Sequence, residues 1–257
     1  AFRRLCDHTQ WKQMEEAPSK ISKTNKDEVK KIIDSLIEAN RYEVGEDPAM
    51  KILSHYGFTF PERALATSAV EAGIIAERIG FPVVMKVSSP DILHKTDVGG
   101  VKLNINSTIA AEDAFDEITT NAQRFMPDAY IEGVMVYEMI KGGKEVIIGV
   151  TYDRTFGHMI MFGLGGIYVE VLKDVSFRIA PLNYQEAEEM IHDIRSIALL
   201  KGARGEKPVD IDAIIKGIIN VSNLVTDFPI IRELDINPML VMNRGAFALD
   251  ARIIFES

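Results

Sequence analysis

The feature that most constrains the fold is the way in which two β-like segments are joined. Residues 133–140 and 144–152 have the apolar, β-branched composition of strands, and only the turn sequence at 141–143 separates them. Tight turns connect antiparallel neighbours, whereas parallel strands need a crossover of about a dozen residues or more. Residues 232–254 repeat the pattern at the end of the chain, with two strands around a short turn. We therefore expect largely antiparallel sheets.

Helices are interspersed with these strands in no regular order. Apolar residues recur at helical spacing in several segments, whereas a doubly wound sheet requires strict strand–helix alternation. The sequence therefore favours an α+β fold. The segments expected to be helical are 27–39, 47–57, 68–79, 110–125, 183–200 and 211–228.

The charge balance and the lack of apolar runs exclude two kinds of partner. The chain has 38 acidic and 29 basic residues and a net charge of −9, whereas nucleic acids and anionic membranes attract basic surfaces. No apolar run approaches the roughly 18 residues of a membrane span, and no signal peptide opens the chain. A single cysteine, Cys6, fits a reducing compartment. We expect a cytoplasmic protein that binds neither nucleic acid nor membranes.

Residues 82–101 combine a buried strand with a polar loop. Lys86 interrupts the apolar strand, either as an edge lysine whose stem covers apolar surface or as a cation that reaches phosphates in a cleft. His94 follows among charged neighbours and precedes the pair Gly99-Gly100. A solvated surface histidine is the simpler interpretation of His94. The functional interpretation is a nucleophile towards phosphorus on a mobile loop, with a carboxylate that fixes its tautomer.

The common nucleotide-binding sequences are missing. Residues 163–168 lack the third glycine of a dinucleotide fingerprint, and no G-x-x-x-x-G-K-[ST] loop occurs. The glycines at 163–166 and the later Arg178 allow two interpretations, a cover over phosphates in which Arg178 binds an oxyanion, or a structural turn. A bound nucleotide would therefore need another architecture.

The C-terminal hairpin carries a group of oxygen ligands. Glu233, Asp235 and Asn237 are two residues apart and so share one face of a strand, while Asp250 lies on the returning strand. Such ligands suit Mg²⁺, which usually takes one or two protein ligands together with substrate phosphates. The alternative is an exposed acidic face. The apolar opposite face indicates a well-formed strand and favours the metal site.

The segment Glu138-Met139-Ile140 ends a predicted strand, and Glu145 begins the next one. From the residues alone, a β-hairpin with solvated glutamates is the favoured interpretation. The alternative is a hinge whose backbone meets an adenine edge, with Glu145 turned towards ribose or metal.

Together these segments resemble the ATP-grasp domain of the NDP-forming acyl-CoA synthetases, the group of ADP-forming acetate–CoA ligases. The similarity spans most of residues 45–255. It rests on four stretches, FPVVMKVSSPDILHKTDVGGV, MFGLGGIYVEVLKDVSFRIAPL, LLKGARGEKPVDIDAI and IRELDINPMLV with FALDARI.

The resemblance implies an ATP-grasp fold of two α+β lobes with the nucleotide between them. We expect an N-terminal helical extension or linker at 1–40, a first lobe with the histidine-bearing loop at 41–132, and a second lobe with the metal-binding hairpin at 133–257. The implied reaction is the reversible conversion of acyl-CoA, ADP and phosphate into acid, CoA and ATP.

The resemblance also assigns roles to the candidate residues. His94 is the phosphorylatable histidine that relays the phosphoryl group to ADP, and Arg178 remains a catalytic candidate. The residues expected to bind ATP or ADP are Lys86, Gly99, Gly100, Glu138, Met139, Ile140 and Glu145. Asn237 and Asp250 are expected to hold Mg²⁺.

The chain lacks the CoA-binding and CoA-ligase regions that the complete reaction needs. We therefore expect a partner subunit or domain that handles CoA and a small carboxylic acid, with this chain as a subunit of a hetero-oligomer or part of a longer chain. The alternative is a non-catalytic nucleotide-sensing module fused to another enzyme, such as a protein acetyltransferase. Such a module would not need His94, Asn237 and Asp250, and all three are present. A carboxylate–amine ligase would need an amine pocket that the sequence does not reveal.

Overall fold

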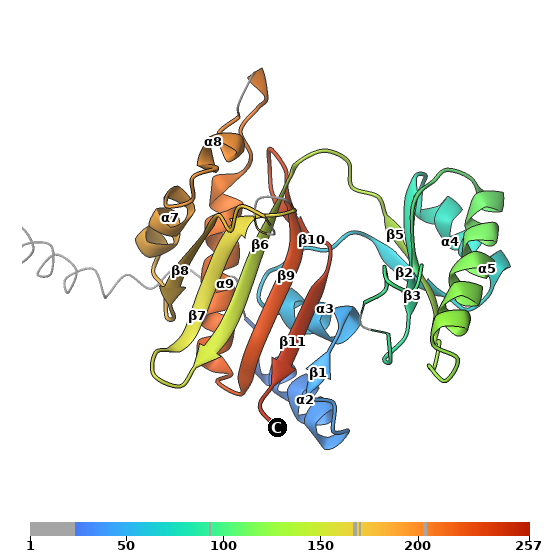
Figure 1. Ribbon diagram of the computed structural model, residues 1–257, viewed down its shortest axis with the longest axis horizontal. Coiled ribbons are helices and arrows are strands. Elements are labelled where there is room, and N and C mark those ends of the chain that lie inside the picture. The colour runs from blue at the N-terminus through green and yellow to red at the C-terminus, as the bar shows by residue number, and fades with distance from the viewer. Residues whose placement is uncertain (1–23, 93, 167–168, 170, 203–204) are drawn as a thin grey trace, which may run out of the picture. The chain divides into compact units, whose positions relative to one another are not determined.

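The computed structural model describes residues 24–257 except 93, 167–168, 170 and 203–204 (Figure 1). It divides into two compact units. Of the described residues, the large unit contains 24–59 and 143–257, and the small unit is Phe60–Gly142.

The large unit is built on a seven-stranded sheet in which every pairing is antiparallel. The strand order is β1-β11-β9-β6-β7-β8, and β10 pairs with β9 as well. Its strands are β1 (Glu43–Val44), β6 (Lys144–Asp153), β7 (Gly157–Leu164), β8 (Val175–Ile179), β9 (Ile231–Val241), β10 (Ala246–Ala248) and β11 (Ala251–Phe255).

In the part of the chain that the structure describes, helices of the large unit cover one face of this sheet and leave the other open. The helix α9 (Ile211–Asp227) packs across the covered face, where a Cβ on Gly217 would lie 3.2 Å from Ile148 (Figure 1). Asp210 caps its first turn by accepting a hydrogen bond of 3.0 Å from the Ala213 amide. The other helices are α2 (Lys26–Glu38), α3 (Glu46–Ser54), α7 (Tyr184–His192) and α8 (Ile197–Leu200).

Strand β9 shows which side chains reach the open face. Leu234 and Ile236 are buried in the core, whereas Glu233 and Asn237 are exposed and Asp235 is half-buried. This alternation confirms that the two carboxylates and the amide share one face, because successive strand residues point to opposite sides.

The small unit is a four-stranded antiparallel sheet covered on one face by two helices. The strand order is β2-β5-β3-β4, and α4 and α5 pack against the sheet around a core of apolar side chains (Figure 1). Each helix begins at a serine N-cap, Ser68 or Ser107, whose side chain accepts an amide hydrogen bond. The elements are β2 (Arg63–Ala66), α4 (Ala69–Ile79), β3 (Val83–Ser88), β4 (Val101–Ile105), α5 (Thr108–Phe125) and β5 (Gly133–Glu138).

The hairpin favoured for residues 133–152 does not form. Strand β5 pairs with β2 and β3 in the small unit, whereas β6 pairs with β7 and β9 in the large unit. The turn-like sequence lies at the boundary between the units, with positive φ angles of 82° at Gly142 and 80° at Gly143. Each strand has neighbours in its own sheet, so the short connection does not imply pairing.

The unit boundaries also differ from the expected lobes. Residues 41–59 belong to the large unit because β1 pairs with β11, and β5 belongs to the small unit because it pairs with β3. Of the expected extension, 1–23 lie outside the described residues. The helix α2 is tied to the large unit by a 2.7 Å ion pair between Lys26 and Asp227. Among the described residues, no helix is long and apolar enough to span a bilayer.

Candidate functional site

Lys86 lies on the open face of the small sheet. Its neighbours Met85 and Val87 are fully buried against the helices, so the alternation of the strand directs Lys86 to the opposite side. Its Nζ atom lies 4.8 Å from the ring centroid of Tyr137 on β5, a cation–π distance. The aromatic ring stabilises the positive charge of the half-buried Lys86 side chain. Tyr137 was not singled out in the sequence, although its period-two position on an adjacent strand is the signal that points to it.

His94 is exposed on the loop that follows β3. This loop has several contacts with the rest of the small unit, and the expected mobility of the loop stays a prediction. Ile92 and Val98 on either side are only 2% and 8% exposed and belong to the small unit's core. Asp91, a candidate for the carboxylate that fixes the imidazole tautomer, instead accepts a 2.7 Å hydrogen bond from the Tyr130 amide.

Gly99 and Gly100 do not offer their amides to a phosphate in this structure. The Gly99 N–H donates to the Thr96 carbonyl at 3.1 Å, and the Gly100 N–H donates to the Lys95 carbonyl at 2.8 Å. A Cβ on Gly100 would lie 2.6 Å from Val87 Cγ1. In this structure the glycines therefore close the loop tightly, and nucleotide binding by Gly99 and Gly100 stays a prediction.

Of the three expected hinge residues, Glu138 is the last residue of β5, and Met139 and Ile140 follow it within the small unit. The amide of Glu138 donates to the Glu62 carbonyl at 2.8 Å, and that of Met139 donates to the Pro82 carbonyl at 3.3 Å. Both amides are thus engaged within the small unit, so an adenine would meet the carbonyls and the backbone of Ile140. These hydrogen bonds continue the pairing of β5 with its neighbours beyond the end of the strand, and the hairpin that the sequence favoured does not form.

Glu145 lies at the start of β6 in the large unit, with an exposed side chain. Its carbonyl accepts a 2.8 Å hydrogen bond from the Gly165 amide. A Cβ on Gly165 would lie 2.9 Å from the Glu145 Cβ, so only glycine permits this approach. The end of the glycine-rich run therefore packs against Glu145.

Asn237 and Asp250 are brought together by the C-terminal strands. The backbone amide of Asn237 on β9 donates to the backbone carbonyl of Asp250 at 3.2 Å. Asp250 lies immediately before β11 and not on the returning strand itself, and this bond holds it beside Asn237. An amide oxygen and a carboxylate fit Mg²⁺, which takes few protein ligands when substrate phosphates complete its shell. The described residues contain no cluster of three or more His, Cys, Asp or Glu that would form an all-protein cage. This donor set is therefore compatible with Mg²⁺ bound together with a nucleotide.

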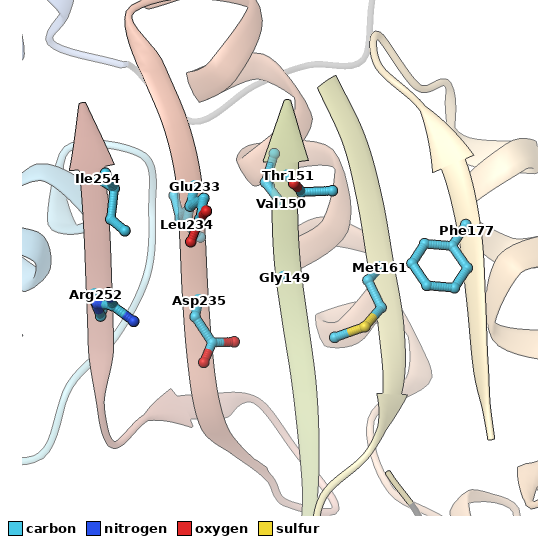
Figure 2. Close-up of a pocket in the computed structure, with 10 residues that line it drawn as sticks. All are labelled: Gly149, Val150, Thr151, Met161, Phe177, Glu233, Leu234, Asp235, Arg252 and Ile254. Carbon is cyan, nitrogen blue, oxygen red and sulfur yellow. The ribbon is translucent and has the colours of Figure 1, made fainter. Parts of the chain in front are cut away.

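Asp235 lies beside this pair in a depression on the open face. Burial raises the pKa of the Asp235 carboxyl, although a hydrogen bond from Asn237 and the charge of Arg252 act in the opposite direction. Figure 2 shows Arg252 and Asp235 on neighbouring strands, with Met161 across Gly149 from them. Neither Arg252 nor Gly149 was singled out in the sequence, and the alternation of β11 and β6 is the signal that places both on this face.

Arg178 is not brought to the open face. It shares the covered face with Ser176, whose hydroxyl donates to the Met190 carbonyl on α7 at 2.6 Å. Its guanidinium donates to Asp193 at 2.5 Å and to the Phe177 carbonyl at 2.9 Å. This arrangement favours the structural interpretation, in which Arg178 ties β8 to the end of α7.

Two antiparallel sheets in an α+β chain, with a lysine on one and neighbouring oxygen-bearing side chains on the other, fit the ATP-grasp class. Residues 35–255 match the family model described as an ATP-grasp domain, and the chain belongs to this family. The expected fold class and family resemblance are confirmed.

Curated relatives specify the branch of the family. The chain is 48% identical to the acetate–CoA ligase [ADP-forming] II subunit beta of Pyrococcus furiosus, over 90% of this chain and 99% of that subunit. It is 47% identical to the 4-hydroxybutyrate–CoA ligase [ADP-forming] of Nitrosopumilus maritimus, over 92% of this chain and 34% of that enzyme. It thus spans about a third of that longer relative and nearly all of the beta subunit.

Solved structures of an acetyl-coenzyme A synthetase are also similar to this chain in fold and sequence. The dinucleotide-forming acetyl-coenzyme A synthetase 1 of Ca. Korarchaeum cryptofilum matches with a TM-score of 0.84 and 42% identity, over 88% of this chain and 99% of that chain. Another structure of that synthetase, with a TM-score of 0.77 and 38% identity over the same shares of both chains, contains coenzyme A and Mg-AMPPCP. In that complex the phosphohistidine segment points towards the nucleotide binding site.

Proposed function

We propose that this chain is the nucleotide-binding component of an ADP-forming acyl-CoA synthetase, in which His94 relays a phosphoryl group between a CoA-ligase partner and ADP. One observation carries the proposal. A single strand, β3, directs Lys86 to an open sheet face and leads directly into the anchored loop that exposes His94. The similarity to a beta subunit over nearly its whole length supports the same conclusion.

In this proposal the remaining candidate residues of each unit bind the nucleotide or its metal. Lys86 binds phosphate oxygens, and the backbone from Glu138 to Ile140 meets the adenine edge. Glu145 lines the nucleotide pocket. Asn237 and Asp250 hold Mg²⁺, which when bound neutralises charge on the phosphates. Positioning and charge neutralisation are what phosphoryl transfer chiefly requires.

The transfer itself is a simple substitution at phosphorus. A lone pair on an imidazole nitrogen of His94 forms a bond to the γ-phosphorus of ATP while the P–O bond to ADP breaks, and ADP leaves with those electrons. In the opposite direction a terminal oxygen of ADP attacks the phosphohistidine. Acyl transfer and CoA chemistry belong to a partner subunit or to another part of a longer chain. The overall sum is acyl-CoA, ADP and phosphate giving acid, CoA and ATP.

Incubation of the chain with γ-labelled ATP and Mg²⁺ tests this proposal. We expect acid-labile, base-stable label on the wild type and none on His94→Ala. His192→Ala is the matched control, because His192 is an exposed histidine on α7 in the large unit. Equal labelling of the wild type and His94→Ala would place the phosphorylated residue elsewhere, and loss of label from His192→Ala would point to His192.

A non-catalytic nucleotide-sensing module would bind ATP without taking up label. The exposed His94 and the juxtaposed Asn237 and Asp250 favour the enzyme component over that alternative. A cytoplasmic location stays a prediction from the sequence.

A further inference from the structure

The loop that carries His94 is fastened at its start by three hydrogen bonds to the segment before β5. The Glu132 amide donates to the Ser88 carbonyl at 2.9 Å, and the Ser88 hydroxyl donates to the Glu132 carboxylate at 2.8 Å. Asp91 adds the third bond, since its carboxylate accepts the Tyr130 amide at 2.7 Å. Asp91 is the last residue of this series before His94, three positions further along the chain.

The other end of the loop is closed by backbone bonds and by close packing. The Gly100 carbonyl accepts the Val87 amide at 2.8 Å, which joins the end of the loop to β3. Lys95 and Gly100 are bonded through their backbone, and Gly100 has no room for a side chain. Val98 is 8% exposed and packs in the core. Both ends of the loop are therefore fixed to the core of the small unit.

These anchors limit how far His94 can travel. Ile92 is 2% exposed, and two fully extended residues span at most about 7 Å. While Ile92 remains in its buried position, the Cα atom of His94 therefore cannot move more than about 7 Å from that position. A larger excursion would have to expose an isoleucine to water and break the Asp91–Tyr130 bond, both of which oppose it.

We infer that Asp91 is a positioning residue for His94, because it fastens the stretch of chain just before this histidine to the small unit. The inference rests on the proposed function. Asp91 acts through the backbone of Tyr130 and does not itself contact the reacting atoms. Its role is to hold Ile92 in the core and so to fix the region in which the imidazole can meet a phosphorus atom.

The chain offers a matched control and a conservative replacement. Asp97 is a second carboxylate on the same loop, and its side chain is exposed. Asp91→Ala removes the acceptor of the Tyr130 amide, whereas Asp91→Asn keeps an oxygen that can accept it. Asp97→Ala removes the same charge from the loop and leaves the anchor intact.

The experiment measures the initial rate of His94 labelling by γ-labelled ATP with Mg²⁺ in the 257-residue chain. We expect Asp91→Ala to label about tenfold more slowly at saturating ATP, with the KM for ATP changed by less than about twofold, because a misplaced nucleophile loses rate without losing substrate binding. Asp91→Asn should stay within about threefold of the wild type, because its bond to Tyr130 is retained. Asp97→Ala should resemble the wild type.

Hydrogen exchange of residues 94–100 provides a second readout. Asp91→Ala should speed their exchange by about tenfold, because local opening becomes easier, while the strands of the small unit keep their protection. An Asp91→Ala variant that labels at the wild-type rate, or an Asp91→Asn variant as slow as Asp91→Ala, would overturn the positioning role. If the wild type itself takes no label at His94, the proposed function fails and this role fails with it.

Discussion

The backbone amide of Asn237 on β9 donates a 3.2 Å hydrogen bond to the backbone carbonyl of Asp250, and this bond places the two expected metal ligands side by side, with Asp250 immediately before β11. The oxygen donors of the large unit therefore converge through ordinary sheet pairing. Asp235 and its hydrogen bond with Asn237 add a half-buried carboxylate to the same face. Substitution of these oxygen donors, and of Lys86 in the small unit, tests whether the two open faces bind a nucleotide and its metal.

Asp250→Ala is expected to weaken Mg²⁺-dependent binding of ATP. Removal of one of two protein oxygen ligands should lower the affinity by about tenfold or more in the presence of Mg²⁺, with little change in its absence. Isothermal titration with and without Mg²⁺ measures both affinities. Glu233→Gln is the control, because Glu233 is exposed on the same face, four residues before Asn237 on β9. Equal losses with and without the metal would point to damage of the strand.

Lys86→Met is expected to lower the affinity for ATP by about tenfold to a hundredfold, which corresponds to loss of a hydrogen bond to a charged group. The methionine keeps the apolar stem that packs near Tyr137, so the melting temperature should change little. Lys102→Met is the control, since Lys102 on β4 is ion-paired with Glu117 on α5. If both substitutions weaken ATP binding equally, the effect is a general loss of positive charge.

Arg178→Ala is expected to leave the rate of His94 labelling unchanged. The guanidinium bonds to Asp193 and the Phe177 carbonyl on the helix-covered side of the sheet, away from the face that carries Asn237. A partly exposed ion pair of this kind contributes about 1 kcal/mol or less to stability. Labelling and urea unfolding measure the two effects separately. A large loss of labelling with normal stability would restore the oxyanion role.

Much of the fold could be predicted because hydrophobic periodicity is a local signal. The period-two alternation of the β9 sequence is enough to place Glu233, Asp235 and Asn237 on one face, and the C-terminal hairpin forms as expected. The connection at 141–143 could not be interpreted in this way. Whether two consecutive strands pair depends on which sheets they join, and the partners of β5 and β6 lie far away in the chain, as in the pairing of Lys144 with Val241.

The candidate site, like the fold, could be predicted from the sequence only in part. Residue types indicated the chemistry of Lys86 and the oxygen donors, and the strand pattern gave their direction. The roles of Gly99, Gly100 and Asp91 depended on hydrogen bonds that the residue types leave open. A glycine pair serves equally well to expose amides to a phosphate or to close a turn, and here both amides bond within the loop. Arg178 was linked to the glycines at 163–166 by its place in the chain, whereas its side chain bonds to Asp193 near the end of α7, and its catalytic role stays a prediction.

Gly100→Ala is expected to destabilise the small unit. The added Cβ would lie 2.6 Å from Val87 Cγ1 and 2.9 Å from the Lys95 carbonyl oxygen, and the second contact is with backbone. Overpacking of this kind costs about 1–3 kcal/mol. Gly149→Ala is the comparison, since its nearest neighbour is the flexible end of Met161 at 3.2 Å. Unfolding of both variants in urea should show the larger loss for Gly100→Ala.

Asp210 should make the stability of the large unit depend on pH in the acidic range. Its two carboxylate oxygens accept hydrogen bonds from the Gly245 amide at 2.7 Å and from the Ala213 amide at 3.0 Å. These bonds, that from Gly245 foremost, hold the pKa of the Asp210 carboxyl below its ordinary value. Because the folded-state pKa is depressed, the charged form stabilises the folded state.

The contribution of Asp210 is therefore fully present above the unfolded-state pKa of about 3.9 and is lost as the pH falls through the lower folded-state value. Asp210→Asn keeps an oxygen for the helix cap but has no second oxygen for Gly245. Its free energy of unfolding should be lower than that of the wild type between about pH 5 and 7, and the difference should shrink below about pH 4. Urea unfolding at a series of pH values measures this difference. A difference that stays constant down to pH values near about 2 would show that the charge of Asp210 is not involved.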